Sequence, residues 1–202
     1  MIYKSITRGP VLTIVPHISH WCSLNLLSFA MLIDTVDKDD HVVGVIEKDA
    51  ALAAGVNFRV VHVFVFNEKG QLLIQQIPQG KRHGGMWGSS IAGYVYSGES
   101  YEQAAHRRLN QELAINTPQR TIHAPLPLIL KTTMKEGAAD KFIALFATRI
   151  SSLPAPNPLE VAAIDGIDID AIERFTETGL RQFTPTFLHL IKAFKTTSEV
   201  TP

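Results

Sequence analysis

The sequence predicts a single α/β domain in which a mixed β-sheet is packed between helices, and three observations support this fold class. Two apolar runs flank a short polar turn, which is typical of a β-hairpin. A capped amphipathic helix follows a glycine-rich stretch, and a third apolar run precedes one more helix. The order strand, strand, helix, strand, helix favours a mixed sheet covered by helices.

The hairpin is formed by the runs Val60–Phe66 and Leu72–Ile77, which are joined by Asn-Glu-Lys-Gly. His62 alternates with apolar neighbours within the first run, so we expect a hydrogen-bonded sheet residue rather than a metal ligand. The following stretch "GKRHGGMWGSS" begins at Gly80, and its glycines predict loop and turn.

The first helix is expected to begin near Ser100. Ser100 and Gln103 have the spacing of a capping box, and apolar side chains then recur with helical period. These apolar residues are Tyr101, Ala104, Ala105, Leu109 and Leu113.

Two later segments complete the predicted domain. The run Phe142–Ile150 is typical of a buried strand, and the prolines after it end the strand. A closing helix is expected after Thr184, which can cap it, with Pro185 in its first turn.

Composition limits the classes of function. A chain of 202 residues that is 46% apolar can bury a core, and its length suits one domain with appendages. Lys plus Arg and Asp plus Glu number 19 each, with no basic stripe, so we expect no nucleic-acid partner. The single cysteine, Cys22, excludes an internal disulfide and a cysteine-based zinc site, and it favours a reducing, cytoplasmic setting.

The first 33 residues differ from the rest because they contain no acidic residue. Their apolar run Trp21–Ile33 is too short to span a bilayer, so no membrane partner is expected. A targeting segment, an added strand or helix, and upstream sequence before a start at Met31 all stay open. The expected organisation is an extension over 1–31, one domain over 32–196 and a tail over 197–202.

The segment from Gly93 to Ile115 carries the most specific motif. It resembles the Nudix box, G-x5-E-x7-R-E-U-x-E-E-x-G-U, in which U is a bulky aliphatic residue. The likeness extends over roughly Leu32 to Phe194, and it implies the Nudix fold. The matching positions are Gly93, Glu99, Arg107, Leu109, Glu112 and Ile115.

In the Nudix family, the box glutamates hold Mg²⁺ or Mn²⁺ against a substrate diphosphate, as hard cations require. Positions 108, 111 and 112 share one side of the helix, where the family usually has three glutamates. Here they are Arg108, Gln111 and Glu112. Each lost or reversed charge changes cation binding by on the order of a few kcal/mol, so the sequence predicts a weakened or lost metal site.

The remaining candidate residues each have an ordinary alternative. Acidic candidates could be surface charges, Glu99 could pair with Arg107 to brace the box, and the basic run at 81–83 could be a solvated loop. The resemblance implies catalytic roles for Glu112 and Glu160, metal-ligand roles for Glu112, Glu99 and Gln111, and structural roles for Gly93 and Arg107. Phosphate oxygens could be bound without metal by Lys81, Arg82 and Arg108.

The box helix also resembles that of isopentenyl-diphosphate isomerases, whose matching helix contains Arg-Arg. That activity needs a cysteine and a histidine where this chain has Ala92 and Tyr94, so we expect no isomerase activity. Other side chains implied by the resemblance are replaced by Ala51, Phe58, Ala139 and Lys141.

Two classes of function therefore stay open. The first is a weak or atypical Nudix-type hydrolase that uses Mg²⁺ or Mn²⁺ to split a small diphosphate-containing molecule. The second is a Nudix-fold module that binds a diphosphate ligand or a protein partner without turnover. The substrate stays open, and so does the oligomeric state, for which a homodimer is one alternative.

Overall fold

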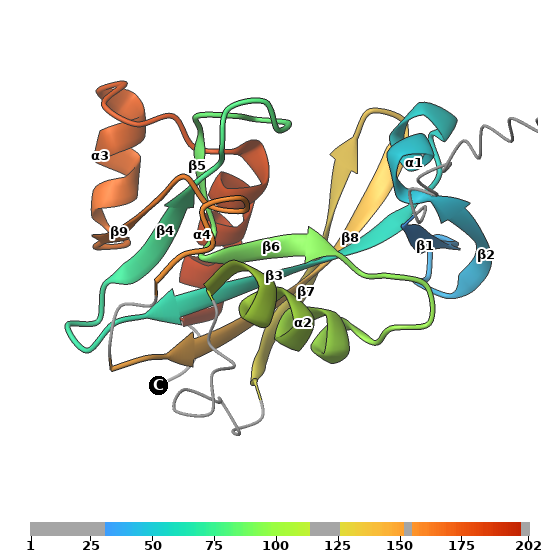
Figure 1. Cartoon of the computed structure of the whole chain (residues 1–202), viewed down its shortest axis with the longest axis horizontal. Coiled ribbons are helices and arrows are strands. Elements are labelled where there is room, and N and C mark those ends of the chain that lie inside the picture. Colours follow the sequence, from blue (N-terminus) through green and yellow to red (C-terminus); the bar gives the residue numbers. More distant parts are fainter. Residues whose placement is uncertain (1–30, 114–125, 152–154, 199–202) are drawn as a thin grey trace, which may run out of the picture.

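The computed structural model describes residues 31–113, 126–151 and 155–198. Most of the N-terminal extension, Ile115 of the box and the last four residues lie outside these ranges. Within the described residues, a nine-stranded sheet and four helices form the fold (Figure 1). None of these helices is both long and apolar enough to cross a bilayer. The strands are β1 (Leu32–Val36), β2 (Val42–Glu47), β3 (Phe58–Phe66), β4 (Leu72–Gln76), β5 (Trp87–Gly88), β6 (Ile91–Tyr94), β7 (Leu128–Glu136), β8 (Ala139–Arg149) and β9 (Ala163–Ile167), and the helices are α1 (Lys48–Ala54), α2 (Tyr101–Leu113), α3 (Ala171–Glu177) and α4 (Pro185–Ser198).

The central strand is β3, and its two neighbours make the sheet mixed. It pairs in parallel with β8 and antiparallel with β6. The expected hairpin is confirmed, but β4 meets β3 only where Leu72 pairs with Phe66. Beyond that point β4 pairs with β5 and β9, so β3 and β4 diverge (Figure 1). The divergence opens the sheet in the middle of the domain.

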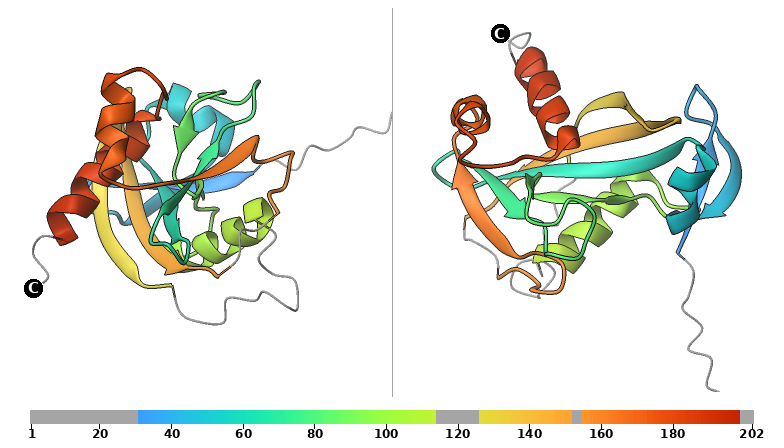
Figure 2. Two further views of the ribbon diagram at one scale, coloured as in Figure 1. Left: turned by 90° about the vertical axis from the view of Figure 1, so that its left-hand side faces the viewer. Right: turned by 90° about the horizontal axis from the view of Figure 1, so that it is seen from above.

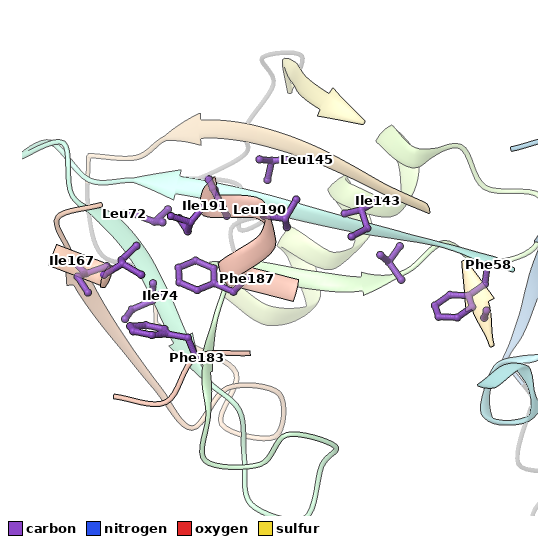
Figure 3. Close-up of a cluster of buried hydrophobic side chains, with 14 of the residues drawn as sticks. Phe58, Leu72, Ile74, Ile143, Leu145, Ile167, Phe183, Phe187, Leu190 and Ile191 are labelled. Atoms are coloured by element: carbon purple, nitrogen blue, oxygen red, sulfur yellow. The ribbon is translucent and has the colours of Figure 1, made fainter. Parts of the chain in front are cut away.

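Helices cover the two faces of the sheet, with α4 on one side and α2 on the other (Figure 2). The alternating side chains of β3 explain this arrangement, because successive residues of a strand point to opposite faces. Val61 and Val63 are buried in the same cluster as Leu109 of α2. Phe64 packs against Phe187 of α4, with ring centroids 6.0 Å apart. Phe187 belongs to the buried cluster of Figure 3, together with Leu190 of the same helix. The predicted α/β fold class is therefore confirmed.

Both predicted helix starts are present. The backbone N–H of Ser100 donates to Gln103 Oε1 (2.7 Å), and the N–H of Gln103 donates to Ser100 Oγ (3.1 Å), which forms a capping box. At α4, the N–H of Phe187 donates to Thr184 Oγ1 (3.3 Å). The first turns of both helices are thus held by side-chain caps.

The sequence did not predict several elements. β7 pairs along most of β8, β9 extends the sheet beside β4, and the short helix α3 follows β9. At the other end of the molecule, β1, β2 and α1 lie together (Figure 1), and β1 joins the sheet where Thr35 pairs with Phe58. Of these elements, α1 and the end of β7 contribute residues at the opening in the sheet.

Candidate binding pocket

A pocket of about 1030 Å³ lies where β3 and β4 diverge. Its wall is formed by residues of β3, β4 and β6, by the helices α1 and α2, and by the loop around Lys81. The segment before β9 and the facing parts of β7, β8 and α4 complete it. The volume suits a small-molecule ligand. The wall carries five cationic side chains and four carboxylates, and these charged residues are Lys48, Lys81, Arg82, Arg108, Lys141, Asp49, Glu112, Glu136 and Glu160.

Glu112 projects from α2 toward the pocket and is almost completely buried, with 1% of its surface exposed. Gln75 Nε2 donates a hydrogen bond to Glu112 Oε2 (2.7 Å), and Arg108 forms an ion pair with Oε1. Burial raises the pKa of Glu112 to about 7, against the opposing effect of the Arg108 charge. This carboxyl group therefore titrates near neutral pH, and it is not the solvated surface charge that its helical position allowed.

The Arg108 side chain packs over β6, and its guanidinium group pairs with Glu112. Its Nε donates to the carbonyl oxygen of Ala92 (3.1 Å), and a second guanidinium nitrogen donates to Gln111 Oε1 (3.1 Å). A Cβ atom at position 93 would lie only 2.6 Å from Arg108 Nε. The box glycine, Gly93, therefore leaves the space through which the arginine reaches the carboxylate.

Glu160 approaches the same guanidinium from the segment before β9. Its Oε2 lies 3.0 Å from Lys81 Nζ and 3.5 Å from Arg108. Burial acts to raise the pKa of Glu160, but the hydrogen bond from Lys81 and the charge of Arg108 outweigh it, so the pKa is lowered. The structure thus brings together Lys81, Arg108, Glu112 and Glu160, four of the residues named from the sequence.

Glu99 is held elsewhere. Both of its carboxylate oxygens accept hydrogen bonds from Arg107, at 2.6 and 2.7 Å, and the backbone N–H of Tyr96 donates to one of them (2.9 Å). The guanidinium of Arg107 also lies 3.6 Å from the ring centroid of Tyr96. Neither Glu99 nor Arg107 is among the described residues that line the pocket. The pair braces the loop that leads into α2, as the sequence allowed.

These contacts decide whether a divalent cation fits the box. Of its candidate carboxylates, Glu99 is saturated by Arg107, and Glu112 is held by Arg108 and Gln75. Glu160 is paired with two cations, and Gln111 accepts hydrogen bonds from arginines. The guanidinium of Arg108 lies between the two acids that a cation would need to bridge. As arranged here, the residues do not fit Mg²⁺ or Mn²⁺.

A separate acidic group lies on the turn between β1 and β2. Ligand atoms of Asp37, Asp39 and His41 all lie within 4.8 Å of one another. Asp37 Oδ1 accepts the backbone N–H groups of Asp39 (2.8 Å) and His41 (2.9 Å). These hydrogen bonds stabilise the turn and account for the position of the Asp37 carboxylate.

Arg82 and its neighbour Lys81 pair with different carboxylates. It forms an ion pair with Glu136 at the end of β7, and Lys141 of β8 pairs with the same carboxylate. Lys141 Nζ also donates to Thr186 Oγ1 (2.7 Å) in the first turn of α4. Neither Glu136 nor Thr186 is among the candidates from the sequence. The acid and the lysine flank the β7–β8 turn, but only the fold shows that loop 78–86 reaches them.

His62 is hydrogen-bonded within the sheet, as predicted. Its Nδ1 lies 2.8 Å from Ser89 Oγ. Burial, with a smaller contribution from Lys141, lowers the pKa of His62 to about 3, so the ring is neutral at physiological pH. Gln75 Oε1, nearby in the wall, is buried without a hydrogen-bond partner among the described residues. His62 and Gln75 therefore contribute polar but uncharged groups to the wall of the pocket.

The mixed sheet lies between α2 and α4, and its strands diverge beside the box helix α2. This arrangement is that of a Nudix-type domain. The NUDIX domain model matches residues 56–189, and the chain belongs to the Nudix family. It is 32% identical over 157 residues to isopentenyl-diphosphate Delta-isomerase of Pectobacterium atrosepticum, covering 75% of this chain and 84% of that protein. The isomerase of Burkholderia multivorans is 30% identical over 159 residues, covering 78% and 89%.

Solved structures agree on the fold. DR0079 from Deinococcus radiodurans matches with a TM-score of 0.66 at 23% identity, covering 80% of this chain and 97% of that chain. The MutT protein from Methanosarcina mazei Go1 matches with a TM-score of 0.53 at 14% identity, covering 71% and 94%. At these identities the likeness supports the fold alone.

The names of the curated relatives conflict with the expectation that isomerase activity is absent. The structure adds that the replaced positions Phe58, Ala92, Tyr94 and Lys141 all line the pocket. This chain therefore shares the frame of the relatives but presents different chemical groups at the positions that the resemblance assigned to the isomerase reaction.

Proposed function

We propose that this protein binds a small molecule through a diphosphate group, with Arg108 and Lys81 taking the place of a divalent cation. The observation that carries the proposal is the position of the Arg108 guanidinium between Glu112 and Glu160. A guanidinium presents a planar set of N–H donors that matches phosphate oxygens, and it needs no metal.

Glu160 is the group that a diphosphate would displace. It is 32% exposed and lies 3.5 Å from Arg108, whereas Glu112 is buried and also bonded to Gln75. Release of Glu160 to solvent frees Lys81 as well, because both cations share its Oε2. Glu112 and the backbone oxygen of Ala92 then keep Arg108 in place for the ligand.

The balance of charge supports an anionic ligand. The wall has one more cation than carboxylates. A diphosphate that enters such a pocket exchanges its hydration for charge-assisted hydrogen bonds, each of which contributes roughly 1.5–3 kcal/mol.

The test is a calorimetric titration with methylenediphosphonate, which cannot be hydrolysed, in the presence of EDTA. Wild type should bind, and Arg108→Met and Lys81→Met should each weaken binding by about tenfold or more, equivalent to the loss of one such bond. Lys69→Met, in the exposed β3–β4 turn, is the matched control and should bind as wild type does. Binding that appears only when Mg²⁺ replaces EDTA would reject the proposal.

A second candidate function is hydrolysis of the bound diphosphate, the activity implied by the resemblance to the Nudix box. It is favoured by Glu112, a buried carboxyl group whose pKa of about 7 suits a general base. Phosphate release from a panel of nucleoside diphosphate derivatives, with and without Mg²⁺, tests this candidate. Turnover that Glu112→Gln abolishes, while methylenediphosphonate affinity persists, would support it; no release under either condition would leave binding as the function.

A further inference from the structure

The pocket contains two carboxylates that each hold a pair of cations. Glu160 holds Lys81 and Arg108, and Glu136 holds Arg82 and Lys141. Lys81 and Arg82 are adjacent in one loop, yet they reach different carboxylates. A single loop therefore connects two cationic groups that face the same pocket.

The group around Glu136 has the features of a built anion site. Lys141 has only 9% of its side chain exposed, and Thr186 Oγ1 fixes its ammonium group at 2.7 Å. Thr186 lies in the first turn of α4, a helix of 14 residues, and the dipole of a helix favours negative charge at this end. In this arrangement the carboxylate of Glu136 occupies the position between the two cations that the oxyanion of a ligand would take.

Glu136 can be exchanged for a ligand more readily than a core acid. It ends β7 immediately before the turn at Gly137, and Arg82 lies in a loop with about half of its side chain exposed. The Glu136 side chain, which is 14% exposed, can turn toward solvent from the end of its strand, and Arg82 can follow a ligand with its loop. Lys141 stays anchored to β8 and Thr186.

We propose that Lys141, Arg82 and Thr186 form a second oxyanion subsite, so that the ligand carries a phosphate or carboxylate in addition to its diphosphate. This inference rests on the proposed function for the diphosphate end, where Arg108 and Lys81 bind. The ligand would span the pocket, with one anionic group at α2 and the other at the start of α4. Apolar and aromatic wall residues, including Val60 and Tyr94, line the pocket that it would cross.

A matched set of compounds tests the inference by calorimetry in EDTA. Each has a methylenediphosphonate ester at one end of a butyl, hexyl or octyl chain and a hydroxyl, carboxylate or phosphate at the other. The compound with the best-fitting length should bind about tenfold or more tightly when its far end is anionic, as expected for one added charge-assisted contact. The carboxylate and phosphate arms show which oxyanion is preferred.

Substitutions in the second subsite test whether it causes the tighter binding of compounds with an anionic end. Lys141→Met and Arg82→Gln should each remove most of the advantage of the anionic end and leave the hydroxyl compound unchanged. Lys135→Met, on an exposed part of β7, should alter neither. Because Lys141 is buried, Arg82→Gln in the exposed loop keeps the test valid should the lysine variant fail to fold.

The outcomes separate this inference from the proposed function. Binding of the hydroxyl compounds with no gain from an anionic end at any length overturns the second subsite and leaves the diphosphate site intact. An equal loss for both end groups in Lys141→Met and Arg82→Gln also overturns it. Hexyl phosphate, which has no diphosphate, should bind weakly in a Lys141-dependent manner even if the diphosphate site fails, and absence of binding by every compound rejects both proposals.

Discussion

Replacement of Glu112 by glutamine should change how the stability of the protein depends on pH. The carboxyl group has 1% of its surface exposed, and its pKa is raised from 4.5 to about 7 by burial. A raised carboxyl pKa means that the folded state binds the proton more tightly than the unfolded state does. Wild type therefore loses stability as the pH rises from about 4.5 to 7, and it retains the full contribution only below that window.

The size of the effect follows from the shift. A difference of about 2.5 pKa units corresponds to about 3 kcal/mol at 1.36 kcal/mol per unit. Other acids, such as Glu136 and Glu160, have lowered pKa values and act in the opposite direction at acidic pH, but they are present in both proteins. The difference in unfolding free energy between wild type and Glu112→Gln should thus isolate this one group.

Urea denaturation at several pH values between about 4.5 and 8 measures that difference. Relative to Glu112→Gln, wild type should become about 3 kcal/mol less stable across the range. Glu102→Gln removes an exposed carboxylate from the same helix and should give a flat difference curve. A flat curve for Glu112→Gln, or one with the opposite slope, would show that Arg108 overcomes the effect of burial.

Three further predictions concern the fold and the isomerase reaction, which we expect to be absent. Glu99→Gln should cost about 1–3 kcal/mol of stability in urea denaturation, because it weakens two charge-assisted bonds; a loss no larger than that of Glu102→Gln would contradict this. Phe187→Ala should cost about 3–5 kcal/mol, since this fully buried ring packs between the sheet and α4, and a loss below about 1 kcal/mol would show that the site collapses. Isopentenyl diphosphate followed by proton NMR should remain unchanged with wild type, because Ala92 and Tyr94 cannot supply the cysteine and histidine; double-bond migration would refute the residue assignment.

The parts of the fold that the sequence predicted are those with local signals. The β3–β4 hairpin follows from two apolar runs and a turn, and the start of α2 follows from Ser100 and Gln103. The sequence failed to predict β7 and β9. β7 has exposed residues between half-buried ones, and β9 is half-buried and short, so neither forms the apolar run of a core strand.

The site shows where sequence reasoning reaches its limit. The absence of two box glutamates was evident from the resemblance of the sequence to the Nudix box, and Glu99–Arg107 was already a candidate pair. The i,i+4 spacing of Arg108 and Glu112 allows their ion pair, but their distant partners were not predictable, because Glu160 lies 52 residues from Arg108 and Gln75 lies 37 residues from Glu112. The divergence of β3 and β4 brings these segments together, and no local pattern encodes it.

A crystal structure with methylenediphosphonate, grown with manganese at millimolar concentration, tests the central claim most directly. Arg108 and Lys81 should contact the phosphonate oxygens, Glu160 should have moved away, and anomalous scattering should show no manganese beside Glu112. A manganese ion bound to Glu112, with the guanidinium of Arg108 displaced from the carboxylate, would contradict the account.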